Sequence, residues 1–343
     1  MASARFFSSS ILVTIIGLIA SYFIGIEFSG PKEGFKTVFF VFVLSILEIS
    51  LSFDNAVVNA TILKRMTPKW RHRFITWGIL IAVFGMRLIF PLAIISLVAH
   101  LNPLSALSLA IYQPTEYERI MTSVHTEING FGGFFLLMVC LKFFFDSSKE
   151  VHWIRGVEAF LSKFGKIEAV EIGMGLLFLL IISNYVDAHH RLDLIIWGIA
   201  GITTFICIEG LGEFLQLDTS TINNAERASF GMFLYLEVID ASFSFDGVLG
   251  AFAITNNLFL IAIGLGIGAM FVRSLTIMLV ELGTLNKYRY LEHGAFWAIG
   301  ALAVLMIIGT FKTVPEIATG LIGFIFITMA FISSRSYVEK IQK

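Results

Sequence analysis

The sequence predicts an all-α polytopic membrane protein with about ten transmembrane helices in two inverted five-helix repeats. Three observations predict this fold: an apolar composition, ten long apolar segments, and an acidic motif that occurs once in each half. Of the 343 residues, 57% are hydrophobic and only 14% are charged, whereas soluble domains average about 25% charged residues. The net charge of −1 argues against a basic, nucleic-acid-binding protein.

Ten segments approach the roughly 20 apolar residues that a spanning helix needs. Two polar stretches between them, 101–129 and 147–169, are expected to be loops. The second has the pattern of a short amphipathic helix on the membrane surface. The candidate spans are 8–28, 36–63, 74–100, 130–146, 170–186, 192–215, 229–255, 257–282, 293–311 and 314–334.

Basic residues in the short loops predict the orientation of the chain. The loop "KRMTPKWRHR", residues 64–73, carries five basic residues and is therefore assigned to the cytoplasm. Alternation of ten spans from this loop places 16 basic residues on the cytoplasmic side and 5 on the other side. Both termini are then expected in the cytoplasm.

An internal repeat divides the chain. "EISLSFDNAVVNA" from Glu48 aligns without gaps with "DASFSFDGVLGAF" from Asp240, and each motif is followed by an arginine-bearing span, with Arg87 and Arg273. The first repeat is expected to cover 1–186, with the 101–129 and 147–169 loops, and the second 187–343. Because five spans per half is an odd number, the second copy is expected to be inverted, as in many transporters with a midplane site.

The motif forms a polar stripe at helical spacing. In the first copy the stripe is Ser45, Glu48, Ser52, Asn55 and Asn59. In the second copy it is Glu237, Asp240, Ser244, Gly247 and Ala251. Asp54 and Asp246 fall beside these stripes, so either the polar face is wide or the helix unwinds near Ser-Phe-Asp. Gly247 would permit unwinding in the second copy.

The charges of the motif do not balance. Glu48, Asp54, Glu237, Asp240 and Asp246 carry up to five negative charges, while Arg87 and Arg273 supply two positive ones. Charged side chains inside a membrane are costly and are usually functional. Carboxylate and amide oxygens without thiolate or imidazole suit Mn²⁺, Mg²⁺ or Ca²⁺. One hypothesis is therefore a transport path for a metal ion. Carboxylates without a metal would bind protons, so metal transport could be coupled to protons.

These motifs resemble the paired acidic motifs of the TerC family of integral membrane proteins. The stretches "YLEHGAFWAIGALAVLM" and "PEIATGLIGF" resemble a branch of that family labelled as a domain of unknown function. The resemblance implies a lysine-exporter-like transporter in the bacterial inner membrane, linked to manganese efflux and tellurite resistance. Carried over by motif, it implies metal ligands at Glu48, Asp54, Asn55, Asp240 and Asp246, with Ser52, Ser244, Glu237, Arg87 and Arg273 in support. The sequence departs from the expected pattern at Asp240, Gly247 and the long 101–129 insert.

Two other interpretations remain open. The acids could form buried ion pairs with Arg87 and Arg273 that only fix helix packing. The whole chain could be a non-transporting membrane scaffold in the response to metal or tellurite stress, with partners at 147–169 and 64–73. Covalent catalysis has no support, because no nucleophile stands in a Ser-His-Asp or Cys-His pattern, so we expect no enzyme and no prosthetic group. The expected ligands are the lipid bilayer and a divalent cation.

Overall fold

The chain is helical throughout the part that the computed structural model describes, which comprises residues 3–30, 32–167, 169–214, 221–252, 254–312 and 314–341. Six helices in this part are long and apolar enough to cross a membrane. They cover Arg5–Glu27, Gly34–Leu51, His125–Phe145, Ala188–Leu211, Leu258–Glu281 and Leu291–Gly309. An integral membrane protein is compatible with these helices, whereas the count of ten spans stays a prediction.

The chain divides into two compact units, each built from segments of both sequence halves. Unit 1 comprises Met1–Ser52, Arg71–His125 and Phe243–Met278, and unit 2 comprises Phe53–Trp70, Thr126–Ser242 and Leu279–Lys343. The predicted repeats meet in the sequence near residue 186. This boundary does not coincide with the boundary of either compact unit.

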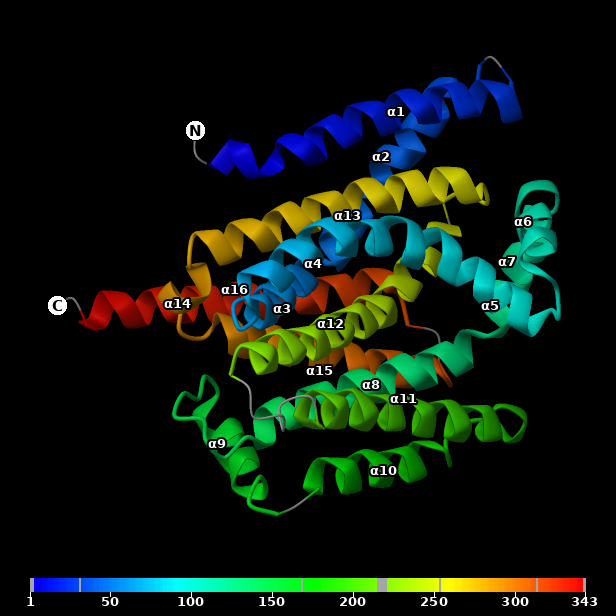
Figure 1. Cartoon of the computed structure of the whole chain (residues 1–343). Coiled ribbons are helices and arrows are strands. Elements are labelled where there is room, and N and C mark those ends of the chain that lie inside the picture. Colours follow the sequence, from blue (N-terminus) through cyan, green and yellow to red (C-terminus); the bar gives the residue numbers. More distant parts are fainter. Residues whose placement is uncertain are drawn as a thin grey trace. The chain divides into compact units, whose positions relative to one another are not determined.

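Unit 1 contains the two N-terminal helices and the segment that carries Arg87. A 3₁₀ turn, Ser3–Phe7, leads into α1, and α1 and α2 lie side by side as an antiparallel pair (Figure 1). Its elements are α1 (Ser8–Ser29), α2 (Gly34–Leu51), most of α4 (Pro68–Leu80), the π-helical segment η2 (Ile81–Ile89), α5 (Phe90–Val98), α6 (Pro103–Tyr112), α7 (Pro114–Ser123), the end of α12 and most of α13 (Leu258–Glu281).

Small residues allow the helices of unit 1 to approach closely, as is common between membrane helices. A Cβ added at Gly264 of α13 would lie 2.5 Å from the Leu44 Cβ of α2. Serine hydroxyls also join α1 to α13: Ser10 Oγ donates to the Met270 carbonyl at 2.8 Å and lies 2.6 Å from Ser274 Oγ. Gly264 therefore allows α13 to pack closely against α2.

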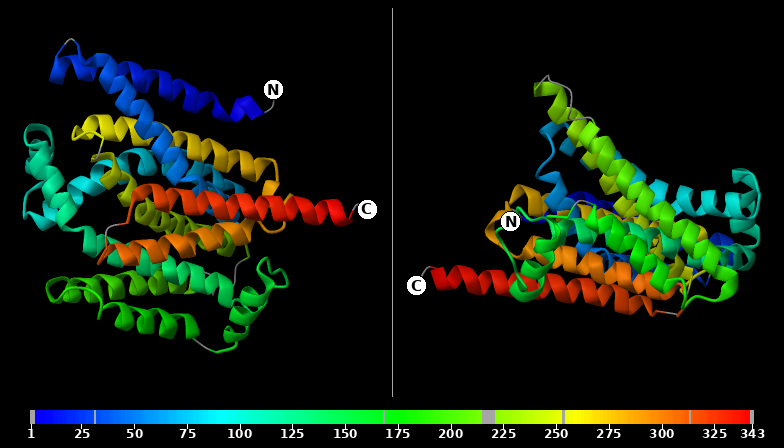
Figure 2. Two further views of the ribbon diagram at one scale, coloured as in Figure 1. Left: turned by 180° about the vertical axis from the view of Figure 1, so that it is seen from behind. Right: turned by 90° about the horizontal axis from the view of Figure 1, so that it is seen from below.

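Unit 2 contains the helix that follows the first acidic motif and most of the C-terminal half. Its elements are α3 (Phe53–Leu63), α8 (His125–Phe145), α9 (Arg155–Phe164), α10 (Val170–Ile182), α11 (Ala188–Phe214), the first part of α12 (Thr221–Phe252), α14 (Thr284–Lys287), α15 (Leu291–Gly309) and α16 (Glu316–Ile341). Within this unit α15 and α16 lie side by side, as do α10 and α11 (Figure 2).

Two predicted loops contain helices. Residues 101–129 were expected to be a loop, but they form α6, α7 and the start of α8. The local sequence explains α6: the Asn102 side chain accepts a hydrogen bond from the Ser105 backbone N–H at 2.8 Å, and Pro103 occupies the first turn, as N-cap and N1 preferences favour. In 147–169 the expected short amphipathic helix is confirmed as α9.

Candidate functional site

The first copy of the motif lies across a helix break. Helix α2 ends at Leu51, Ser52 has φ −102° and ψ 15°, and α3 begins at Phe53. The Ser52 backbone N–H still donates to the Glu48 carbonyl at 2.9 Å, so the break is a local change of direction in the hydrogen-bond ladder. Glu48 therefore belongs to α2, and Asp54, Asn55 and Asn59 belong to α3.

Glu48 is buried in unit 1 beside an arginine. The Arg87 guanidinium of η2 donates to Glu48 Oε1, and Ser52 Oγ donates to the same oxygen at 2.9 Å. Glu48 is 2% exposed and Arg87 is 6% exposed. The predicted pairing of an acid of the motif with Arg87 is thus present for Glu48. The π-helical turn around Arg87 has no counterpart in the predicted pattern, and such turns occur frequently at functional sites.

Two glycines make room for the Glu48 side chain. A Cβ added at Gly268 of α13 would lie 2.5 Å from both Cβ and Cγ of Glu48. A Cβ added at Gly247 of α12 would lie 2.9 Å from Glu48 Oε2. Gly247 occupies the position that aligns with Asn55, so the absence of a side chain there leaves space for the carboxylate of the other copy.

Asp54 is buried in unit 2, where it lies against α16. It is 4% exposed, and a Cβ added at Gly323 would lie 3.0 Å from Asp54 Oδ2. Its Oδ1 accepts a hydrogen bond from the Asn55 backbone N–H at 3.1 Å. Among the described residues of unit 2, no basic side chain lies within ion-pair distance of Asp54. Asp54 thus differs from Glu48, whose charge has a partner in its own unit.

The two copies of the motif meet within unit 2. Asn59 Nδ2 of the first copy donates to Asp240 Oδ1 of the second copy at 3.1 Å. Asn55 and Asn59 are both buried, and the Oδ1 atom of each accepts no hydrogen bond from any described group. These two amide oxygens therefore keep acceptor capacity beside a carboxylate.

The second copy lies on an unbroken helix. Helix α12 runs from Thr221 to Phe252, so the unwinding that Gly247 would permit does not occur there. Ser244 is buried, and its hydroxyl has no hydrogen-bond partner in the described part of the chain; Glu237 is also buried. The side chain of Asp246 lies outside the described residues, so its predicted approach to Asp54 stays a prediction.

Arg273 has a different role from Arg87. Its guanidinium donates to the Phe74 backbone carbonyl and lies over the Phe74 ring, with 5.2 Å from Cζ to the ring centroid. These contacts join α13 to α4 within unit 1. Its predicted influence on the charge of the motif stays a prediction.

The described acids do not form a complete metal centre. No group of three histidine, cysteine, aspartate or glutamate side chains in the described part of the chain is placed to hold a metal ion. The closest approach to a ligand set is Asn59 with Asp240, to which the buried amide of Asn55 on the same helix would add an oxygen. Assignment of Glu48, Asp54, Asn55, Asp240 and Asp246 as ligands therefore remains a prediction.

A cavity of about 420 Å³ lies in unit 2 beyond the polar motif. Thr61 of α3 and Tyr235 of α12 line it, and these are the helices that carry Asn59 and Asp240. Its other charged lining residues are Arg65, Lys142, Asp146, Lys149 and Glu171. Burial lowers the pKa of Lys149 to about 7, although the Glu292 and Asp146 carboxylates oppose this shift.

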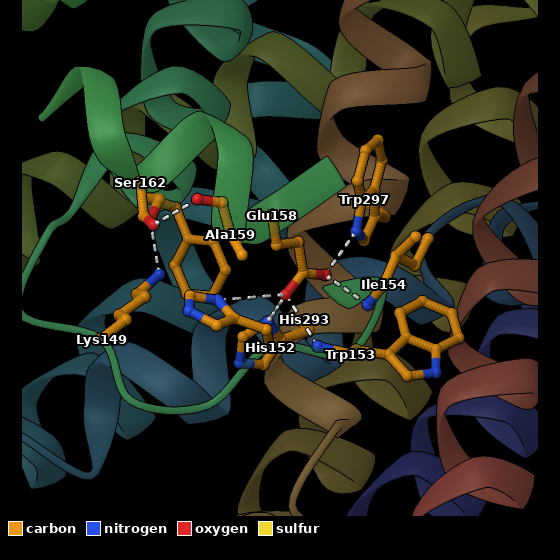
Figure 3. A network of polar contacts seen from close by, with 10 residues as sticks. Lys149, His152, Trp153, Ile154, Glu158, Ala159, Ser162, His293 and Trp297 are labelled. Carbon is orange, nitrogen blue, oxygen red and sulfur yellow. Dashed lines mark hydrogen bonds and ion pairs between the residues drawn. The ribbon is translucent and has the colours of Figure 1, made fainter. Parts of the chain in front are cut away.

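Sequence reasoning missed a buried carboxylate outside the acidic motif, Glu158 of α9 (Figure 3). Glu158 is 1% exposed and accepts hydrogen bonds from the Trp153 N–H at 2.7 Å and the Trp297 Nε1–H at 2.8 Å. His293 Nδ1 lies 2.8 Å from the same carboxylate, and the Ile154 N–H donates to it at 3.2 Å. One signal was present in the sequence. A glutamate in the first turn of a helix can accept hydrogen bonds from the N–H groups just before the helix, as in a capping box.

Comparison with known proteins gives a family. The model of a protein family of unknown function, DUF475, matches residues 53–340. The chain is therefore an integral-membrane-like, all-helical protein that belongs to the DUF475 family. No curated protein matched the chain. No solved structure matched it either.

Proposed function

We propose that the chain is a transporter that exports a hard divalent cation, with manganese as the first candidate and calcium or magnesium as alternatives. The observation that carries the proposal is Asp54, a buried carboxylate without a basic partner among the described residues of its unit. A charged side chain at the centre of a membrane helix costs about 3 kcal/mol on insertion scales. A bound cation would offset that cost.

The oxygen donors of α3, the helix that carries Asp54, support a hard cation. Asn55 and Asn59 each keep an amide oxygen without a hydrogen-bond donor among the described groups, and Asp240 contacts Asn59. Such oxygens, combined with carboxylates, are ligands that manganese, magnesium and calcium accept. Glu48 is paired with Arg87 within unit 1, and its role as a ligand stays a prediction.

Each copy of the motif contacts the other copy through its first acid. Glu48, the first acid of the first copy, lies against Gly247 of the second copy, and Asp240, the first acid of the second copy, accepts from Asn59 of the first. Each contact falls inside one unit. Glu48 meets the position that aligns with Asn55, whereas Asp240 meets Asn59, so the two contacts are not equivalent and the two-fold relation stays a prediction. Inverted repeats of this kind place substrate sites at the repeat interface. The resemblance to the TerC family adds the manganese and tellurite expectation.

The cavity beside Thr61 and Tyr235 would then be the inner vestibule. It adjoins α3 and α12 next to Asn59 and Asp240, and its lining includes Lys149, whose low pKa reduces positive charge in the cavity above about pH 7. A neutral Lys149 amine would oppose an entering cation less than a charged one.

One observation favours a second function. The Glu48–Arg87 ion pair, with both side chains buried, is what the packing interpretation requires. If all the acids only fix packing, the protein is a membrane scaffold in metal or tellurite stress and carries no ion.

Flux in proteoliposomes separates the two functions. Purified full-length protein is reconstituted, and uptake of Mn²⁺, Mg²⁺, Ca²⁺ and Zn²⁺ is followed with and without a pH gradient. The transporter proposal predicts saturable Mn²⁺ flux above that of empty liposomes, and a response to the pH gradient if protons are the coupling ion. Flux equal to that of empty liposomes for every cation favours the scaffold.

A further inference from the structure

An apolar groove of about 420 Å³ runs along the surface of unit 2 between α8, α15 and α16. Its lining is carbon-rich and includes Leu137 and Phe144 of α8, Trp297 and Leu305 of α15, Phe326 of α16 and Leu161 of α9. Helices α8 and α15 are both long and apolar enough to span the membrane. The groove therefore lies where hydrocarbon chains, rather than water, would meet it.

The groove lining follows two neighbouring helices. It extends from residue 137 to residue 144 on α8 and from residue 297 to residue 305 on α15. At 1.5 Å per residue these stretches correspond to about 10–12 Å. A carbon-lined groove of this extent can hold part of one acyl chain.

Helix α9 covers one end of this groove. The Phe144 and Trp297 rings are 4.7 Å apart there, and Trp297 Nε1 donates to Glu158 of α9. Trp297 thus lines the groove and is hydrogen-bonded to α9 through Glu158 (Figure 3). The four hydrogen bonds that Glu158 accepts fix α9 at this end.

The exposed surface of residues 155–167, which comprise α9 and the turn after it, has the composition of a segment in the headgroup region. Val157, Phe160 and Ile167 expose 45–57% of their surface. The basic residues of this surface, Arg155, Lys163 and Lys166, are exposed as well. Apolar side chains together with a cluster of cations are typical of helices that bind anionic membrane surfaces.

We propose that this groove is a binding site for one membrane phospholipid with an anionic headgroup. Its acyl chain lies between α8, α15 and α16 beside Leu161, and its headgroup phosphate lies beside Arg155, Lys163 and Lys166. The polarity of the site matches the lipid along its length: carbon in the groove, and positive charge at the end where Glu158 fixes α9. This site is separate from the acidic motif and does not depend on cation transport.

The test is native mass spectrometry of the full chain after exchange into equal amounts of phosphatidylglycerol and phosphatidylcholine. The wild type should retain one phosphatidylglycerol with a preference of roughly tenfold, since each surface cation favours an anionic lipid by several-fold. Ala301→Leu, which adds bulk to the groove lining, should lose this lipid. Ala200→Leu on α11, the same change outside the lining, should retain it.

The headgroup contribution is tested by charge reversal. The triple variant Arg155→Glu, Lys163→Glu and Lys166→Glu should bind both lipids equally. A control triple with the same change in charge, Lys32→Glu, Arg191→Glu and Lys312→Glu, alters exposed residues elsewhere and should keep the preference. Equal retention of both lipids by the wild type, or displacement of the phospholipid by equimolar palmitate, would overturn the proposal.

A second readout needs no substitution in the groove lining. Cys140 lines the groove and is 8% exposed, whereas Cys207 is exposed. In Cys207→Ala protein, phosphatidylglycerol should slow maleimide labelling of Cys140 several-fold more than phosphatidylcholine does. Equal labelling rates with the two lipids would contradict the proposal even if Ala301→Leu does not fold.

Discussion

At the residue scale, three of the buried carboxylates have different surroundings. Glu48 has an arginine, Glu158 has four hydrogen-bond donors, and Asp54 has a backbone N–H and no basic partner among the described residues of its unit. Burying an ionised group without compensation is expensive. The partners of Glu48 and Glu158 compensate their burial, whereas Asp54 would need a bound ligand for the same compensation.

Glu158→Gln should destabilise the protein. Burial would raise the Glu158 pKa, but the contacts with His293 and Trp297 outweigh burial and hold it at about 2. Because the folded-state pKa lies below the unfolded value of about 4.3, the carboxylate stabilises the fold above that value and loses this effect as the pH falls through about 2. At pH 7 the loss in the free energy of unfolding should be about 3 kcal/mol.

Denaturant unfolding in detergent at pH 7 and pH 4 measures this effect. The difference between the wild type and Glu158→Gln should be smaller at pH 4, where the unfolded glutamate is already largely protonated. Glu150→Gln is the matched control, because Glu150 is exposed, and it should change stability by less than about 0.5 kcal/mol. A variant as stable as the control would show that the network does not hold α9.

Sequence patterns identify most polar residues of the motif but not their partners. The stripe of Ser45, Glu48, Ser52, Asn55 and Asn59 follows from helical spacing, and all five residues are buried. The ion pair of Arg87 with Glu48 depends on tertiary geometry, which the sequence pattern does not contain. Glu158 was missed because its donors, Trp297 and His293, lie more than 130 residues away.

At the element scale, glycines decide how closely the helices pack. Gly268→Ala should destabilise unit 1 by about 1–3 kcal/mol, a typical cost of overpacking. The added Cβ would meet Glu48 Cβ and Cγ at 2.5 Å and the Ser45 carbonyl oxygen at 3.0 Å. These atoms belong to the backbone or lie next to it, so α2 and α13 would have to separate.

Gly210→Ala is the matched control for Gly268→Ala. Gly210 also lies within a helix, α11, but a Cβ there meets no atom within 4 Å. This change should stabilise the protein by up to about 1 kcal/mol, since alanine is the better helix former. Thermal unfolding of both variants checks the pair, and equal effects would contradict the close packing of α2 on α13.

The helix break at Ser52 shows what local sequence can predict. Unwinding near Ser-Phe-Asp was one of two expectations, and the break occurs in the first copy only. Gly247, which would permit a break in the second copy, instead makes space for Glu48. Glycine propensity cannot distinguish these uses, because the distinction depends on which helix lies opposite.

At the scale of the whole molecule, ion pairs agree with the predicted alternation of spans. Lys69 pairs with Glu226 at 2.8 Å and Arg65 pairs with Glu292 at 3.2 Å, all within unit 2. The basic-residue bias assigns the ends of these helices to the cytoplasmic side. Residues predicted to share one side of the membrane thus lie together, while the orientation itself stays a prediction.

The helical, membrane-like character of the fold followed from composition, because long apolar segments are a strong signal. The insert 101–129 was misjudged because its two helices are short and begin at prolines. The division into two units that mix the sequence halves could not be predicted, since it depends on contacts between distant segments.

The most direct test of the account is Mn²⁺ flux through proteoliposomes that contain Asp54→Asn. This change removes a buried charge with little change in volume, and no basic partner in the described part of unit 2 is left uncompensated. The protein should fold and insert, and its Mn²⁺ flux should fall to the level of empty liposomes. Asp187→Asn, the same change at an exposed site, should transport at the wild-type rate. A folded Asp54→Asn protein that carries Mn²⁺ as fast as the wild type would contradict the proposed function of the acidic motif.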